Sequence, residues 1–208
     1  MPQRTRKRMG GGGAMVKSNT QSVLVLCAHD LPLPKQRTID DLNEMGTDLT
    51  GVYDYKLDAV AAATIDLATA LFAEKLEGAA APRSPGRPED RVLVVTSGGK
   101  DDWRDVLSRA EVLQREFTRR VGIDAFSPLR SARRASLEVE GRSGDLGDSA
   151  EYTARLLAKR DLSSVTVVVS PAADAAAARR VFEDALPPGV DVEIASSADR
   201  AAKKRRVS

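Results

Sequence analysis

Small and polar residues suited to holding a ligand follow several short apolar runs of this chain. The first group is Ser97-Gly98-Gly99-Lys100, directly after the run VLVVT at 92–96 and before a segment of helical spacing. Glycine allows a ligand to approach the main chain closely, and amides at the start of a helix attract anions. The spacing matches neither a P-loop nor the dinucleotide fingerprint G-x-G-x-x-G. An anion-binding turn and a plain glycine turn both stay open as interpretations.

A second polar group lies at the end of LEVE, 137–140, and in the loop behind it. Glu138 and Glu140 are two residues apart in a predicted strand, so they face the same side, and Ser143 and Asp145 follow. Burying a carboxylate costs several kcal/mol unless it is partnered, so we expect Glu140 to be a polar site residue. The alternative is that it pairs with an arginine at the sheet edge.

His29 and Asp30 close the first apolar run, VLVLCA at 23–28. The stretch VLVLCAHD is similar to the opening strand of zinc deacetylases of the LmbE type. Because His29 is the only histidine of the chain, a zinc site that needs further histidines is excluded. His29 is then either a single acid/base or ligand contact or a polar loop residue. The long acidic segment at 31–50 is a lid, a flexible insert or a solvated loop, and we expect a solvated loop rather than a metal site.

Five β-branched runs, alternating with segments of helical period, have to position these residues. Most of the runs lack polar alternation, which is typical of strands buried on both faces of a parallel sheet. Strands are predicted at 23–28, 92–96, 137–140, 165–170 and 190–195. Helices are predicted at 57–76, through 106–121 with Asp101 or Asp102 as the N-cap and Gly122 at the end, from Asp148 with Glu151 in capping-box spacing, and at 172–185. Right-handed crossovers turn this order into a three-layer, doubly wound, mainly parallel α/β sheet of about five strands.

Ligands of doubly wound sheets bind outside the carboxyl ends of the strands. That rule selects four stretches, 28–50, 97–102, 141–147 and 170–174, and it adds Ser170 to the candidates. The polar groups described above all lie in these stretches or directly before them.

Composition predicts one domain with basic ends. The chain has 208 residues, of which 42% are hydrophobic and 30% charged, with a net charge of +2. We expect a single domain at 21–195, a disordered basic and glycine-rich tail at 1–20, and a basic tail at 196–208. No apolar run approaches the roughly 20 residues of a membrane span, and no signal peptide is predicted. With one cysteine, these features favour the cytoplasm, and KKRR at 203–206 leaves nuclear import open.

Several short motifs occur in an order that resembles a known family. They are Lys56-Leu57-Asp58-Ala59-Val60, Ser97-Gly98-Gly99, Ser108-Arg109-Ala110-Glu111, Glu140-Gly141-Arg142-Ser143-Gly144-Asp145, and Val169-Ser170-Pro171 with Arg179 to Phe182. Over about residues 22 to 186 the chain resembles the YdcF/SanA/ElyC-like family, α/β proteins with a Rossmann-like fold and largely unassigned function. The chain departs from the family pattern at Lys56, usually arginine; Arg109, usually glutamate; Leu146 and Ser149, usually threonine and asparagine; and Ala173, usually histidine.

The resemblance implies a small-molecule ligand at the strand ends, nucleotide-like or S-adenosylmethionine-like, because one family member binds S-adenosylmethionine. It names no reaction, no catalytic residue and no metal, and the oligomeric state stays open. The candidate ligand-binding residues are Ser97, Gly98, Gly99, Lys100, Glu140, Ser143, Asp145, Lys56, Ser170, His29 and Asp30. One rival is an inactive interaction or scaffold protein that kept the fold. Nucleic-acid binding through the basic tails ranks last, because only 4% of the residues are aromatic.

Overall fold

The structure, a computed structural model, describes residues 22–35, 37–45, 56–78, 92–126, 135–158, 160 and 164–198. Its centre is a sheet of five parallel strands in the order β3-β2-β1-β4-β5. The strands are β1 Ser22–Cys27, β2 Val92–Ser97, β3 Ala135–Glu140, β4 Ser164–Val169 and β5 Asp191–Ser196. The predicted three-layer, Rossmann-like sheet of five strands is confirmed, and each strand lies within two residues of its predicted start and end.

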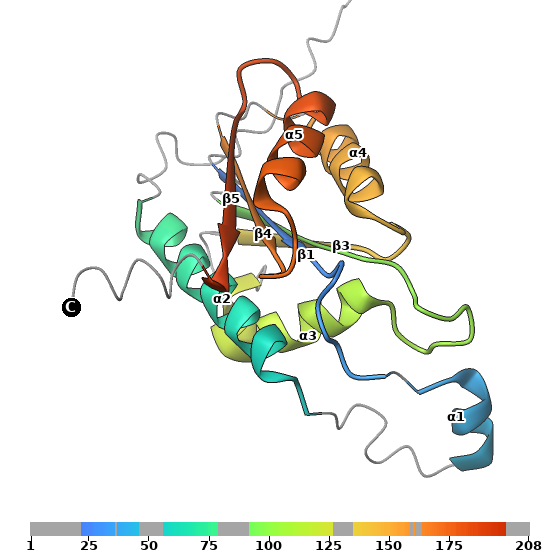
Figure 1. The fold of residues 1–208 in the computed structure, drawn as a ribbon. Helices are drawn as coiled ribbons and strands as arrows, with labels where there is room; N and C mark the ends of the chain where they lie inside the picture. Colours follow the sequence, from blue (N-terminus) through green and yellow to red (C-terminus); the bar gives the residue numbers. More distant parts are fainter. Residues whose placement is uncertain are drawn as a thin grey trace, which may run out of the picture.

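Four helices cover the two faces of the sheet (Figure 1). They are α2 Ala59–Gly78 and α3 Arg109–Val121 on one face, and α4 Leu146–Leu157 and α5 Ala175–Ala185 on the other. The side chains of β1 alternate between these layers, so Leu24 packs with Phe72 and Phe117, while Val25 packs with Phe182. Each face thus forms its own apolar core, and the loops at the strand ends are left to carry polar groups.

The acidic segment after β1 contains a short helix that the sequence pattern does not predict. Helix α1, Ile39–Met45, begins after Thr38, whose main-chain amide and hydroxyl both donate to Asp41 Oδ2 at 2.6 and 2.8 Å. Asp40 lies 3.6 Å from Arg104. These two carboxylates therefore have local partners, and residues 46–50, the rest of the segment, lie outside the described ranges. A second short element, the 3₁₀ turn Ile123–Phe126, follows α3.

Three predicted helix starts were wrong, because in each case a different residue forms the N-cap of the helix. Ser108 caps α3 in a capping box with Glu111, not Asp101 or Asp102. The other two caps are Asp145 for α4, in place of Asp148, and Asp174 for α5, which begins at Ala175, three residues after the predicted start. Gly122 does end α3 as predicted.

The predicted tail at 1–20 lies outside the described residues, and so does the predicted tail at 196–208 except for residues 196–198, of which Ser196 is the last residue of β5. Among the helices within the described ranges, none is both long enough and apolar enough to span a membrane.

Candidate functional site

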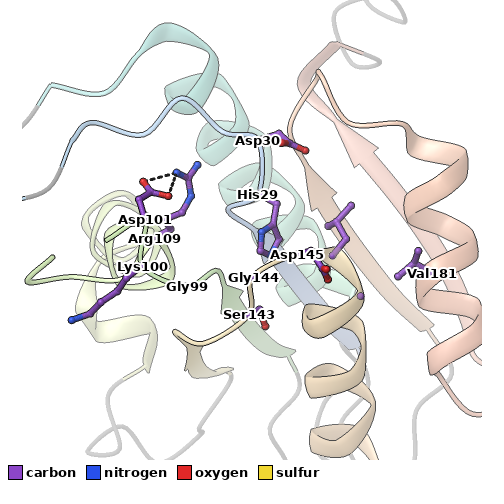
Figure 2. A pocket seen from close by; sticks show the side chains of 12 residues that line it. His29, Asp30, Gly99, Lys100, Asp101, Arg109, Ser143, Gly144, Asp145 and Val181 are labelled. Atoms are coloured by element: carbon purple, nitrogen blue, oxygen red, sulfur yellow. Dashed lines mark hydrogen bonds and ion pairs between the residues drawn. The ribbon is translucent and has the colours of Figure 1, made fainter. Parts of the chain in front are cut away.

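An open pocket of about 790 Å³ lies at the carboxyl edge of the sheet (Figure 2). Three loops form most of its wall: the residues after β1, the residues after β2, and the loop between β3 and α4. Six of the predicted residues line it: His29, Asp30, Gly99, Lys100, Ser143 and Asp145. Six further residues complete the lining: Asp101, Arg109, Gly144, Leu146, Gly147 and Val181.

The other predicted site residues lie around this pocket rather than on its wall. Ser97 and Glu140 are buried, and Gly98 follows Ser97 at the end of β2. Ser170, also buried, donates from its hydroxyl to the carbonyl of Asp30 at 3.0 Å and so supports the main chain where Asp30 adopts φ 59°. Lys56 is exposed just before α2 and is not among the described residues that line the pocket.

The two glycine amides after β2 are already engaged. Gly98 N–H donates to the carbonyl of Glu140 at 3.0 Å, and Gly99 N–H donates to the carbonyl of Ser143 at 2.7 Å. Helix α3 begins only at Arg109, so it does not follow the glycines directly. Of the two interpretations of this stretch, the plain turn describes these amides, because neither is free to hold an anion.

Strand register brings the buried polar residues together. Ser97 pairs with Cys27 on one side and with Glu140 on the other, so the last residues of three neighbouring strands lie side by side. The residues two positions earlier, Val25 and Val95, belong to the core under α4 and α5, so these end residues face the same layer. Helix α4 begins above them.

Glu140 is held by hydroxyls and main-chain amides. Its Oε2 accepts from Ser97 Oγ at 2.8 Å and from Ser143 Oγ, and its Oε1 accepts from the amides of Arg142 and Ser143 at 2.7 and 3.0 Å. Burial raises the pKa of this carboxyl, but the hydrogen bonds from Ser143, Ser97 and the two amides outweigh burial and leave its pKa below the ordinary value. Glu140 is therefore ionised at neutral pH. Its partners are hydroxyls and main-chain amides, and not the arginine that the alternative interpretation of the sequence would have paired with it.

A chain of hydroxyls joins this carboxylate to the pocket. Ser97 Oγ lies 2.7 Å from Ser149 Oγ on α4, and Ser149 Oγ lies 2.9 Å from Nε2 of His29. Ser149 is buried, whereas His29 is half-buried and lines the pocket. Ser149 was not predicted as a site residue; the one signal for it was its position at the usual asparagine of the family pattern that the chain resembles.

The pKa of His29 is lowered from its ordinary value. The main cause is burial, and the positive charge of Arg109 adds to it. Asp145, Asp30 and Glu140 act in the opposite direction but do not reverse the shift. His29 is therefore neutral at pH 7 and carries one N–H and one lone pair.

Arg109 lines the pocket, and its guanidinium is engaged by other groups of the protein. Its guanidinium donates to both carboxylate oxygens of Asp101 at 2.8 and 2.9 Å, to the carbonyl of Ala28 at 3.0 Å and to that of Leu31 at 2.5 Å. Lys100 donates to the carbonyl of Asp105 at 2.6 Å, and Figure 2 shows its ammonium pointing away from His29 and Asp145. The carboxylates of Asp30 and Asp145 thus face the pocket without an ion pair to either cation.

Neither the thiol of Cys27 nor any group of metal-binding side chains forms a second candidate site within the described ranges. Burial, with a smaller contribution from the charge of Glu140, raises the pKa of Cys27 to about 12, so this thiol stays protonated at neutral pH. Within the described ranges, no group of three or more His, Cys, Asp or Glu side chains is placed to hold a metal ion.

Comparison of the chain with protein-family models, with curated proteins and with solved structures found no match.

Acid is expected to destabilise the protein in two steps. The lowered pKa of His29 means that the unfolded chain binds a proton more readily, so stability falls as pH drops below 6.5 towards the folded pKa. The lowered pKa of Glu140 gives a second loss as pH falls below 4.5. Urea unfolding at several pH values between 8 and 3.5 measures both steps.

The variants His29→Gln and Glu140→Gln show which residue causes each loss of stability. His29→Gln should remove the loss below pH 6.5, Glu140→Gln should remove the loss below pH 4.5, and each should leave the other loss in place. Stability that is the same at pH 7.5 and pH 5.5 in the wild type would contradict the assignment to His29.

Proposed function

We propose that this chain is a YdcF-like protein that binds an S-adenosylmethionine-like molecule in the pocket at the strand ends. The observation that supports this most directly is the electrostatic character of the pocket. Asp30 and Asp145 face it as carboxylates, while Arg109 and Lys100 are turned to protein acceptors. A ligand with a positive centre and hydroxyl groups is complementary to such a wall.

A nucleotide is less complementary because its phosphates would meet these carboxylates. The amides of Gly98 and Gly99, the natural phosphate cradle at this place in the fold, donate to carbonyls of the chain. The carboxylate of Asp145 itself occupies the start of α4, where its Oδ1 accepts from the amide of Asp148 at 2.9 Å. Among ligands of the size that fits about 790 Å³, a sulfonium nucleoside is therefore favoured over a nucleoside phosphate.

The single tryptophan offers a direct test of binding. Trp103 is 80% exposed and lies two residues after Asp101, which lines the pocket. Titration with S-adenosylmethionine should change its fluorescence in a saturable way, and calorimetry should give the same affinity. S-adenosylhomocysteine, which lacks the sulfonium charge, should bind about fivefold to tenfold more weakly, as expected for loss of one charge interaction near a protein surface.

Asp145→Asn separates charge from structure. Asparagine is as good an N-cap as aspartate, so α4 should stay intact while the pocket loses one negative charge. We expect S-adenosylmethionine to bind about tenfold more weakly to this variant and adenosine monophosphate to bind no more weakly. The matched control is Asp174→Asn, which changes the N-cap of α5 outside the pocket lining and should leave both affinities unchanged.

Each other outcome has a definite meaning. If nucleotides bind the wild type more tightly than S-adenosylmethionine, the site is a nucleotide site. If neither ligand class binds at millimolar concentration, the proposal fails and the interaction or scaffold protein becomes the better hypothesis. We further propose that the protein acts in the cytoplasm without membrane attachment.

A further inference from the structure

The hydroxyl chain between Glu140 and His29 has a fixed direction, because each serine hydroxyl has a single proton to donate. Glu140 is ionised and can only accept. Ser97 Oγ lies 2.8 Å from Glu140 Oε2 and 2.7 Å from Ser149 Oγ, whereas Ser143 Oγ is 3.4 Å away. Because a carboxylate has no proton, only Ser97 can supply the proton of its contact with Glu140. The proton of Ser97 is therefore used, and Ser97 can only accept from Ser149.

The same assignment of one proton to each hydroxyl also decides the hydrogen bond of His29. The proton of Ser149 goes to Ser97, so Ser149 Oγ must accept from Nε2 of His29, 2.9 Å away. A neutral imidazole has one N–H, and here it lies on Nε2. Nδ1 then carries the lone pair, and it has no partner among the described residues.

We propose that Glu140, acting through Ser97 and Ser149, fixes His29 as the Nε2–H tautomer and makes Nδ1 the hydrogen-bond acceptor of the pocket. His29 is thus the residue that meets the ligand, and Glu140 is a positioning residue. The ligand class follows: the group opposite Nδ1 is an N–H or O–H donor, such as an amino group or a ribose hydroxyl. That last step rests on the proposed function, whereas the tautomer does not.

The arrangement also equips His29 to accept a proton. If a bound hydroxyl or amine transfers its proton to Nδ1, the ring becomes an imidazolium, and its Nε2–H still donates to Ser149. The charged groups around the ring are Arg109 of α3, Asp30 beside it, Asp145 before α4 and Glu140 of β3. The three carboxylates favour the imidazolium, and Arg109 opposes it.

If every hydrogen bond between residue 140 and His29 ran in the opposite direction, His29 would adopt the opposite tautomer. If the group at position 140 donates a proton to Ser97, then Ser97 donates to Ser149 and Ser149 donates to Nε2. The neutral ring must then carry its proton on Nδ1. The tautomer of His29 therefore reports the donor or acceptor character of position 140 across three hydrogen bonds.

Nitrogen-15 NMR of protein labelled in histidine tests this without a ligand. Because the chain has a single histidine, every ring signal belongs to His29. At pH 7.5 the wild type should show a protonated Nε2, whose proton exchanges slowly with water, and an unprotonated Nδ1. Glu140→Gln should shift the ring towards Nδ1–H, because Oε1 can stay with the main-chain amides while the NH₂ group donates to Ser97.

Two further variants complete the test. Ser149→Ala should speed exchange of the Nε2 proton at least tenfold and return the ring to the tautomer mixture of free imidazole. Thr64→Val removes another buried hydroxyl, one that donates to the carbonyl of Val60 within α2, and should leave the His29 signals unchanged. Should Glu140→Gln fail to fold, Ser97→Ala interrupts the hydrogen-bond chain at its next link. Ser149 can then either donate to Nε2 or accept from it, so the ring should become a mixture of the two tautomers.

Two results would overturn the proposal. One is an Nδ1–H tautomer in the wild type. The other is a wild-type pattern that persists when the chain is interrupted at Ser149 or Ser97. Neither result depends on whether S-adenosylmethionine binds, so failure of the tautomer proposal and failure of the ligand proposal are distinguishable.

Discussion

Replacing Glu140 with alanine is expected to lower the free energy of unfolding by about 4 kcal/mol. The carboxylate accepts from the hydroxyls of Ser97 and Ser143 and from the amides of Arg142 and Ser143. With only 5% of the residue exposed, water has little access to the donors that remain. Each buried donor left without a partner costs about 1–3 kcal/mol, and partial rearrangement of the loop recovers some of the sum.

Urea unfolding at pH 7 measures this loss. Glu140→Gln, which keeps an acceptor for the two amides, should cost only about 1–2 kcal/mol. Glu138→Ala is the matched control, because Glu138 lies two residues earlier in β3, on the same side of the strand, and is only partly buried. It should change stability by less than about 1 kcal/mol. Equal losses at positions 138 and 140 would show that the buried network contributes nothing of its own.

The sheet was predictable because its strands carry their own signal. Runs such as VLVVT and VTVVV are β-branched, lack charges and are bounded by polar residues, which favours buried parallel strands over helices. Their order along the chain, with right-handed crossovers, then leaves few arrangements. The observed order β3-β2-β1-β4-β5 is one of these.

Helix starts were less predictable because several residues near each start are able to cap. Asp102 accepts from the amide of Arg104 at 3.0 Å, and Asp105 accepts from the amide of Asp102 at 2.9 Å. These aspartates thus stabilise a turn before the helix, and Ser108 with Glu111 takes the cap. Which of several suitable residues becomes the N-cap depends on the path of the chain after it leaves the sheet. The local sequence does not show this path.

Part of the candidate site followed from strand ends alone. Ser97 was predicted in one polar group and Glu140 with Ser143 in another, and the structure brings the three into one hydrogen-bonded group. Ser149 and Arg109 were not predicted as site residues, because both lie in helices and neither residue type stands out there. Their roles depend on how α3 and α4 meet the end of β1, which is a tertiary feature.

Two of the positions at which the chain departs from the pattern of the proposed family have hydrogen-bond partners of their own. Arg109, in place of the usual glutamate, binds Asp101 and the carbonyls of Ala28 and Leu31. Ser149, in place of the usual asparagine, joins His29 to Ser97. Under the proposed family assignment, these contacts at Arg109 and Ser149 favour a changed site over a lost one.

Replacing Gly98 with alanine is expected to cost about 3 kcal/mol of stability. A Cβ at this position would lie 2.6 Å from Cβ of Ala28 and 3.3 Å from Cβ of Arg109, and φ is +151°, where residues with side chains are strained. The residue cannot easily move away. Its amide donates to the carbonyl of Glu140, and its carbonyl accepts from the amide of Ala110, each at 3.0 Å.

Two further variants decide whether the contact with Ala28 is the cause. Gly78→Ala, at the end of α2 with no atom within 4 Å of the new Cβ, should change stability by less than about 1 kcal/mol. Adding Ala28→Gly to Gly98→Ala removes the closest contact, so the double variant should recover about 1–2 kcal/mol relative to the sum of the single changes. Strict additivity in urea unfolding would instead assign the whole loss to the backbone conformation of residue 98. A recovery in the double variant would show that Gly98 is needed because the end of β1 and the start of α3 pack against it, directly after the residue that bonds to Glu140.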